Sequence, residues 1–283
     1  MDTIFACIDG STVNNAVCDA ARWASARLAK PVTLLHTLEK QAQHGADTLS
    51  GNIGLGAQSE LLEQMAQLDQ ERARLAMQYG KALLETAVAR FGDDHSEPVN
   101  SLLRHGDFVE TLVELESQAR LMVVGKVGLD HGGQFSAVGS HIETLLRQVH
   151  TSVLIANQLF QPPQNFMLAY DGRDTADRSL ARIIDGGLLA GLPCHLVMVK
   201  SGDSAREEKL QAAEHRLTEA GFEVTSALLE GPIFESLQSY QQAHEVSMLV
   251  MGAFAHSKVR QLFLGSNTIR MLENATLPLI VLR

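Results

Sequence analysis

Two segments of this chain share one internal organisation, and this repetition is the feature that most constrains the fold. Residues 121–156 and residues 248–282 each begin with an apolar run that ends in glycine. Each then passes through a small-residue turn and a loop to a glycine followed by serine, and closes with a helical pattern and a second apolar run. A repeat of this length indicates duplicated units, so the sequence predicts two copies of one fold.

Length and composition limit the class of protein. The 283 residues suit two domains of ordinary size, and a hydrophobic content of 45% is enough to build a core in each. No apolar run approaches the ~20 residues that span a bilayer, and the first residues lack the basic region of a signal peptide. Three cysteines without a CxxC pair fit a reducing compartment. We therefore expect a cytoplasmic protein that does not insert into a membrane.

The net charge of −10 bears on possible ligands. Nucleic-acid binding generally relies on Lys and Arg side chains to neutralise phosphates, so an acidic chain argues against that function. Any phosphate-bearing ligand must be held by a local group of residues.

Both halves alternate short apolar runs with segments of helical pattern. The expected strands are Thr3–Ile8, Val32–His36, Pro98–Leu103, Leu121–Val124 and Ser152–Ala156, then 166–170, 194–199, 223–229, 247–251 and 278–282. The expected helices lie near 12–29, 57–91, 107–119 and 139–149, then 174–191, 204–221, 233–244 and 265–274. This alternation requires right-handed crossovers and a parallel sheet covered on both faces. The sequence therefore predicts an α/β chain with two doubly wound parallel sheets.

A polar segment with two consecutive prolines separates the halves. We place the first domain at 1–157, the linker at 158–164 and the second domain at 165–283. The first domain is longer, because Asp9 to Gly125 spans 116 positions whereas Asp171 to Gly252 spans 81. The surplus falls in an insert at about 40–92.

The insert contains a glycine-rich stretch and a long helical segment. The stretch at 45–56 departs from the GxGxxG phosphate loop and does not directly join a strand to a helix, so it favours a flexible loop or lid. In the helical segment, apolar side chains recur near helical spacing: Leu61, Met65, Leu68, Leu75, Tyr79, Leu83 and Val88. We expect this stripe to lie in the core or at an interdomain contact.

The candidate ligand site lies after the strands, because open parallel sheets bind ligands beyond the carboxyl ends of their strands. In the second half, Asp171 can accept hydrogen bonds from a ribose or adenine, and the last helix offers free N–H groups at its start. Residues 256–270 carry four cationic or imidazole side chains and no acid. The candidate nucleotide-binding residues are Asp171, Gly252, Ala255, His256, Gly265, Ser266, Asn267 and Thr268.

The first half offers a parallel but altered set. Its candidates are Asp9, Gly125, Gly128, Gly139 and Ser140. Glu143 and Asp130 add negative charge where an anionic ligand would lie. If only one half binds a nucleotide, charge favours the second.

Simpler interpretations remain open for these residues. An Asp-Gly pair is common in turns, and a serine after glycine is a common helix N-cap. The scattered histidines form no HxxxH or HExxH pair, so we expect no metal site. The chain also lacks a P-loop, a nucleophile elbow and an identifiable nucleophile with its base. We expect at most slow ATP hydrolysis.

Taken together, these motifs resemble the universal stress protein family in its tandem form. The resemblance rests on an aspartate after the first strand and on glycines spaced by two and then nine residues, the last followed by serine or threonine. It implies an adenine nucleotide alpha hydrolase-like sheet of order 3-2-1-4-5 in each half, pairing through the last strands, and ATP in some members. Two features depart from the pattern: Ala255 replaces the second glycine, and ten residues precede Gly139.

The resulting hypothesis is a stress-response regulatory module that binds ATP or a related adenine nucleotide, with or without Mg²⁺, chiefly in its second domain. The alternative is a nucleotide-free scaffold or ligand-binding protein that acts through protein contacts. Further self-association or a protein partner is compatible with both hypotheses.

Overall fold

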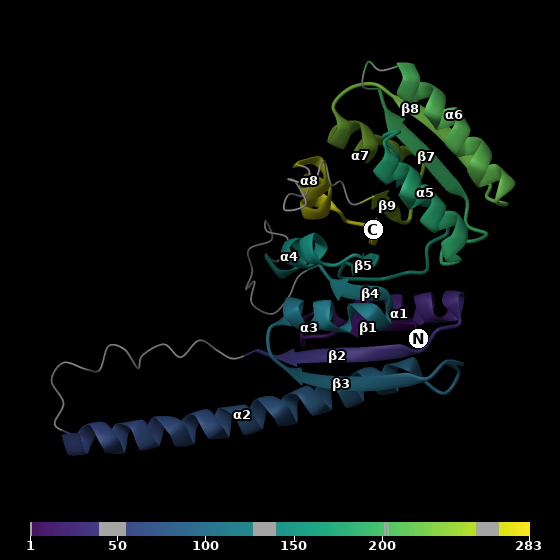
Figure 1. Cartoon of the computed structure of the whole chain (residues 1–283). Coiled ribbons are helices and arrows are strands. Elements are labelled where there is room, and N and C mark those ends of the chain that lie inside the picture. The colour runs from purple at the N-terminus through teal and green to yellow at the C-terminus, as the bar shows by residue number, and fades with distance from the viewer. Residues whose placement is uncertain (1, 40–54, 127–139, 201, 203, 253–265) are drawn as a thin grey trace.

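The computed structural model describes residues 2–39, 55–126, 140–200, 202, 204–252 and 266–283. Ten strands form one sheet in the order β3-β2-β1-β4-β5-β10-β9-β6-β7-β8 (Figure 1). The first-half strands are β1 (Thr3–Cys7), β2 (Val32–Leu38), β3 (Val99–His105), β4 (Ala119–Gly125) and β5 (Val153–Ala156). The second-half strands are β6 (Phe166–Ala169), β7 (Cys194–Val199), β8 (Val224–Leu229), β9 (Leu249–Gly252) and β10 (Leu279–Leu282). Each half has the expected order 3-2-1-4-5.

The two halves join through their last strands. β5 and β10 pair antiparallel, with Leu154 opposite Ile280, whereas every other recorded pairing is parallel. The antiparallel junction makes one continuous sheet from two parallel ones. The expected intramolecular pseudo-dimer is therefore confirmed.

Helices cover both faces of the sheet, as a doubly wound fold requires. One face carries α1 (Asn14–Leu28), α2 (Leu55–Phe91), α5 (Asp174–Gly186) and α6 (Ser204–Glu219). The other carries α3 (Phe108–Leu115), a short 3-10 turn η1 (Glu116–Gln118), α4 (Ser140–Gln148), α7 (Ile233–Ala243) and α8 (Ser266–Asn274). Alternate residues of a strand enter opposite cores, as Ile4 and Phe5 of β1 do. Each core runs through both halves.

The expected strands and helices are all present, and two helices, α3 and α5, are each five residues shorter than predicted. α3 ends at Leu115 and continues only as η1. α5 ends at Gly186 rather than near residue 191, because Gly187 adopts a left-handed conformation with φ of 75°. A glycine at this position can adopt the left-handed conformation that ends a helix without a clash of a Cβ atom, which explains why α5 ends early.

The insert helix α2 has two distinct parts. Its second part packs on the sheet, with Leu84, Ala87 and Phe91 buried. Its first part projects from the body of the molecule (Figure 1), and Leu68 and Leu75 are more than half exposed. The expectation that the whole apolar stripe would lie in the core or at an interdomain contact is therefore wrong for the first part. The glycine-rich stretch before Leu55 lies outside the described residues.

Candidate functional site

Two aspartate–glycine pairs lie where the strand order reverses. β6 and β9 are parallel neighbours with Ala169 beside Met251, so Asp171 and Gly252 reach the same edge of the sheet. β1 and β4 bring Asp9 and Gly125 together in the same way. In a doubly wound sheet, a crevice outside the carboxyl ends of the strands forms at this point. The structure thus brings together part of each predicted set.

The rest of each predicted set is only partly described. Ser266, Asn267 and Thr268 form the first turn of α8, and Ser140 is the first residue of α4. Both helices follow a strand that ends at the candidate edge, so their N-termini lie at that edge. Ala255, His256 and Gly265 of the second half, and Gly128 and Gly139 of the first, lie outside the described residues.

Asp171 lies beside two cationic side chains. Its carboxylate accepts a hydrogen bond from the backbone N–H of Arg173 at 3.1 Å, and the Arg173 guanidinium is 3.5 Å from the other carboxylate oxygen. Lys209 of α6 donates to the carbonyl oxygen of Gly172 at 2.8 Å. Lys209 also lies 4.0 Å from the Asp177 carboxylate, so each of these two cations has a carboxylate partner at this edge.

Sequence reasoning missed both of these cations. Arg173 directly follows the Asp-Gly pair, so its position alone was a usable signal. Lys209 is 38 positions from Asp171 in the sequence, and only the packing of α6 brings it to this turn.

Thr268 carries a buried hydroxyl that has no hydrogen-bond partner among the described residues. Its side chain is 1% exposed, and its hydroxyl oxygen makes no hydrogen bond within the described part of the chain. A buried polar group left unpaired costs about 1–3 kcal/mol. The hydroxyl therefore provides an unused hydrogen-bonding group in the first turn of α8.

Gly252 and Gly125 have packing roles. A Cβ atom at Gly252 would lie 2.6 Å from Ser179 Oγ of α5, and one at Gly125 would overlap Val13. Each glycine therefore lets a helix pack closely on the strand that ends at the candidate edge.

The packing role gives a testable prediction. We expect Gly252→Ala to lower the free energy of unfolding by about 1–3 kcal/mol, because the added methyl group overpacks against Ser179. The double variant Gly252→Ala with Ser179→Ala removes the obstructing hydroxyl and should recover most of that loss. Urea unfolding monitored by circular dichroism measures both changes. Equal losses in the single and double variants would contradict the packing explanation.

One cation of the expected positive segment is engaged elsewhere. Arg270 of α8 forms an ion pair with Glu235 at 2.7 Å and lies 4.4 Å from the ring centroid of Phe234. Both partners belong to α7, so Arg270 joins these two helices. The cationic side chains at 256–260 lie outside the described residues.

The first-half edge is lined differently. The Asp9 carboxylate accepts from the backbone N–H of Ser11 at 2.9 Å, which closes the same type of turn as at Asp171. A Cβ atom on Gly10 would overlap the Tyr79 hydroxyl, so the insert helix α2 covers this glycine with an aromatic residue. In the second half, Lys209 contacts the corresponding Gly172. The side chain that contacts this glycine is therefore Lys209 in the second half and Tyr79 in the first.

The side chain of Lys126 points away from the candidate edge of the first half. Its ammonium group donates to the carbonyl oxygens of Glu273 and Ala275 at 2.9 and 2.7 Å, at the end of α8. Glu143 in the first turn of α4 pairs with Arg147. Lys126 and Arg147 of the first half are therefore engaged away from its edge, whereas Arg173 and Lys209 lie at the edge of the second half.

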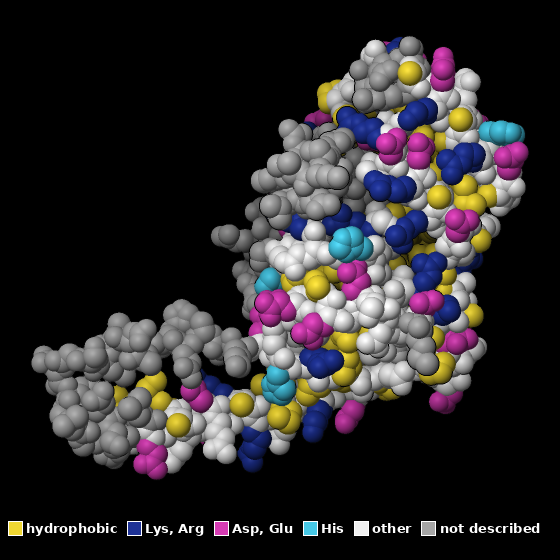
Figure 2. Space-filling view, viewed as in Figure 1, with side chains coloured by type: hydrophobic (Ala, Val, Ile, Leu, Met, Phe, Trp, Pro, Cys, Tyr) yellow, Lys and Arg dark blue, Asp and Glu magenta, His cyan; other side chains and the backbone are white. Residues whose placement is uncertain are grey.

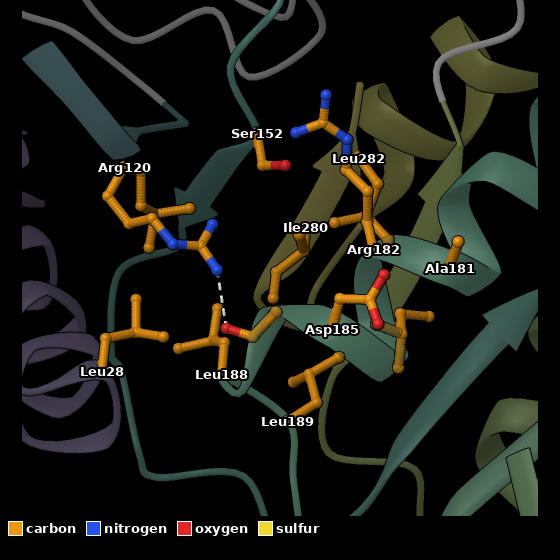
Figure 3. A pocket seen from close by; sticks show the side chains of 13 residues that line it. Leu28, Arg120, Ser152, Ala181, Arg182, Asp185, Leu188, Leu189, Ile280 and Leu282 are labelled. Carbon is orange, nitrogen blue, oxygen red and sulfur yellow. Dashed lines mark hydrogen bonds between the residues drawn. The ribbon is translucent and has the colours of Figure 1, made fainter. Parts of the chain in front are cut away.

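A cavity of about 260 Å³ lies away from both candidate edges. Figure 3 shows Arg120, Ser152 and Arg182 around it, with Arg120 donating to the Gly186 carbonyl oxygen at 2.6 Å. Its lining comes from both halves and includes no predicted site residue. It is a gap between the halves, at the end of β4 opposite to Gly125.

No helix in the described ranges is long and apolar enough to cross a membrane. Within those same ranges, no three His, Cys, Asp or Glu side chains converge as a potential metal site.

Comparisons with known proteins agree with the duplicated fold. The model of the universal stress protein family matches residues 1–157 and again residues 163–283. A universal stress protein of Synechocystis sp. is 30% identical over 287 residues, and the alignment covers 100% of both chains.

Solved structures show the same fold over the whole chain. A universal stress protein from Archaeoglobus fulgidus has a TM-score of 0.67 at 16% identity, covering 99% of this chain and 98% of that one. A putative universal stress protein from Pseudomonas aeruginosa has a TM-score of 0.64 at 15% identity, covering 100% and 93%. This chain therefore belongs to the universal stress protein family, in its tandem form.

Proposed function

We propose that the chain binds ATP or a related adenine nucleotide as a regulatory ligand, chiefly at the carboxyl edge of its second half. The observation that carries the proposal is the buried hydroxyl of Thr268 in the first turn of α8, which has no hydrogen-bond partner in the described part of the chain. It lies at the edge where Asp171 and two cations also gather. A site that combines a carboxylate, cations and a helix start suits a ligand with both hydroxyl and phosphate groups.

Each described residue has a distinct part in this proposal. Asp171 accepts hydrogen bonds from the ribose or adenine, and Lys209 and Arg173 attract the phosphates. The first N–H groups of α8 and the Thr268 hydroxyl can donate hydrogen bonds to the nucleotide, and the N-terminus of a helix favours a negatively charged ligand. Gly252, Gly265 and Ser266 match the family pattern, Ala255 takes the position of its second glycine, and His256 is proposed as a further hydrogen-bond donor. We assign the nucleotide a regulatory role, with at most slow hydrolysis.

Mass spectrometry of the protein purified without added ligand, followed by calorimetric titration with ATP and Mg²⁺, tests this proposal. We expect retained nucleotide or a micromolar Kd, which corresponds to about −8 kcal/mol of binding free energy. Titrations without Mg²⁺, and with ADP and AMP, show which groups are recognised. The absence of both retained nucleotide and binding heat would overturn the proposal.

The projecting part of α2 favours a second candidate function, that of a scaffold acting through protein contacts. Its apolar side chains are exposed in the folded chain. This function needs no nucleotide, so it would persist if the titrations were negative.

A further inference from the structure

The projecting part of α2 presents a row of apolar side chains to solvent. Leu68, Leu75 and Tyr79 are 54%, 53% and 51% exposed. Figure 2 shows hydrophobic and charged side chains along this helix at the lower left, away from the body of the molecule. Exposed apolar rows of this kind mark interaction sites, and an amphipathic helix gains most of its stability from packing.

The spacing of the row is that of a coiled coil. Residues 61, 65, 68, 72, 75 and 79 are separated alternately by four and three positions. This is the heptad pattern of a and d positions, occupied by Leu61, Met65, Leu68, Arg72, Leu75 and Tyr79. The six positions make a seam of about 28 Å at 1.5 Å per residue. We call these six residues the α2 seam.

The α2 seam faces away from the domain that carries it except at its last residue, Tyr79, which reaches the Gly10 turn. The side of α2 that packs on the sheet contains Gly80, Leu84, Ala87 and Phe91. At 3.6 residues per turn, the seam is rotated by roughly a quarter turn from that side. A second helix can therefore lie along the seam beside the domain.

Charge along the projecting helix is divided into two blocks. From 63 to 71 the charged residues are Glu63, Asp69 and Glu71, whereas from 72 to 81 they are Arg72, Arg74 and Lys81. All six side chains are exposed, and Arg72 and Asp69 form a loose ion pair at 3.9 Å. Two such helices attract each other when they run antiparallel, because each acidic block then faces a basic block.

All six seam positions overlap in one antiparallel register. Pairing positions that sum to 140 places Leu61 opposite Tyr79, Met65 opposite Leu75, and Leu68 opposite Arg72. Arg72 then lies beside the acidic Asp69 and Glu71 of the second copy. In a parallel pair, Arg72 of one chain would instead lie opposite Arg72 of the second chain. A single polar residue in a seam commonly specifies orientation in this way.

We propose that the α2 seam is a self-association surface through which two copies of the chain pair antiparallel. The interface is independent of the candidate nucleotide edge of the second half. It lies on the first half, beside the Gly10 turn that Tyr79 covers.

Light scattering or sedimentation equilibrium of the full chain tests the proposal. We expect a mass twice that of the 30.8 kDa chain at micromolar concentration. Leu68→Lys with Leu75→Lys should raise the dimer Kd at least tenfold, because each buried leucine contributes about 1.5–3 kcal/mol. Ile233→Lys is the matched control, since Ile233 is 44% exposed on α7 of the second half and should leave the dimer intact.

Engineered cysteines test the orientation. In the proposed register Met65 faces Leu75 of the second copy, so a mixture of Met65→Cys and Leu75→Cys chains should form a disulfide on oxidation. Either variant alone should not cross-link, because its two cysteines would be about 15 Å apart along the helices, beyond the reach of a disulfide. The native cysteines Cys7, Cys18 and Cys194 are buried and do not compete.

Three results would overturn the proposal. The first is a monomeric wild-type chain. The second is a dimer that Leu68→Lys with Leu75→Lys leaves unchanged while circular dichroism shows the same fold, because the interface would then lie elsewhere. The third is efficient cross-linking of Met65→Cys chains alone, which would indicate a parallel pair.

Discussion

Replacing Asp171 with alanine is expected to weaken ATP binding by about ten- to a hundredfold. A hydrogen bond to a charged group contributes about 1.5–3 kcal/mol, and each 1.4 kcal/mol corresponds to a tenfold change in Kd. The proposed site uses this carboxylate for the ribose or adenine, so its loss removes at least one such bond. Calorimetric titration of the variant with ATP measures the change directly.

Asp9→Ala is the matched control for that variant. Asp9 makes the same kind of turn bond, to Ser11, that Asp171 makes to Arg173. The two variants therefore lose equivalent local structure, and only the second-half variant should lose affinity. The reverse result would place the nucleotide in the first half and contradict the charge argument based on Lys209 and Tyr79.

Leu154→Ala is expected to lower the free energy of unfolding by about 2–5 kcal/mol, the usual cost of a cavity at a fully buried leucine. Leu154 is completely buried on β5 and lies opposite Ile280 across the antiparallel junction. Because the core on its side of the sheet runs through both halves, we expect one cooperative unfolding transition that shifts as a whole. Urea unfolding followed by circular dichroism measures the change.

Leu159→Ala provides the comparison, because Leu159 is 69% exposed five residues further along. Its unfolding free energy should stay within about 0.5 kcal/mol of the wild-type value. Two separate transitions in the Leu154 variant, with only one of them shifted, would show that the halves unfold independently.

Local pattern was sufficient to predict the architecture. Alternating apolar runs and helical segments indicated all ten strands and eight helices, and the repeated glycine motif indicated two equivalent halves. These features could be predicted because strand and helix periods depend on near neighbours in the chain. The early end of α5 at Gly186 shows the limit of the method, since only the conformation of Gly187 decides it.

The projecting part of α2 shows a second limit. Its apolar spacing predicted an amphipathic helix, and the helix is present. The same spacing could not show that Leu84 would be buried while Leu68 remained exposed. The length of the helix relative to the sheet beneath it makes that difference.

By itself, the sequence determined the duplicated α/β fold and the placement of an aspartate and a glycine at the carboxyl edge of each half. Only the tertiary structure decided what surrounds those residues. It brings Lys209 to Gly172 and Tyr79 to Gly10, turns Lys126 toward the end of α8, and leaves the Thr268 hydroxyl buried without a described partner. The physical reason is that strand and helix patterns arise from neighbouring residues, whereas charge and packing at a site depend on segments that only folding brings together.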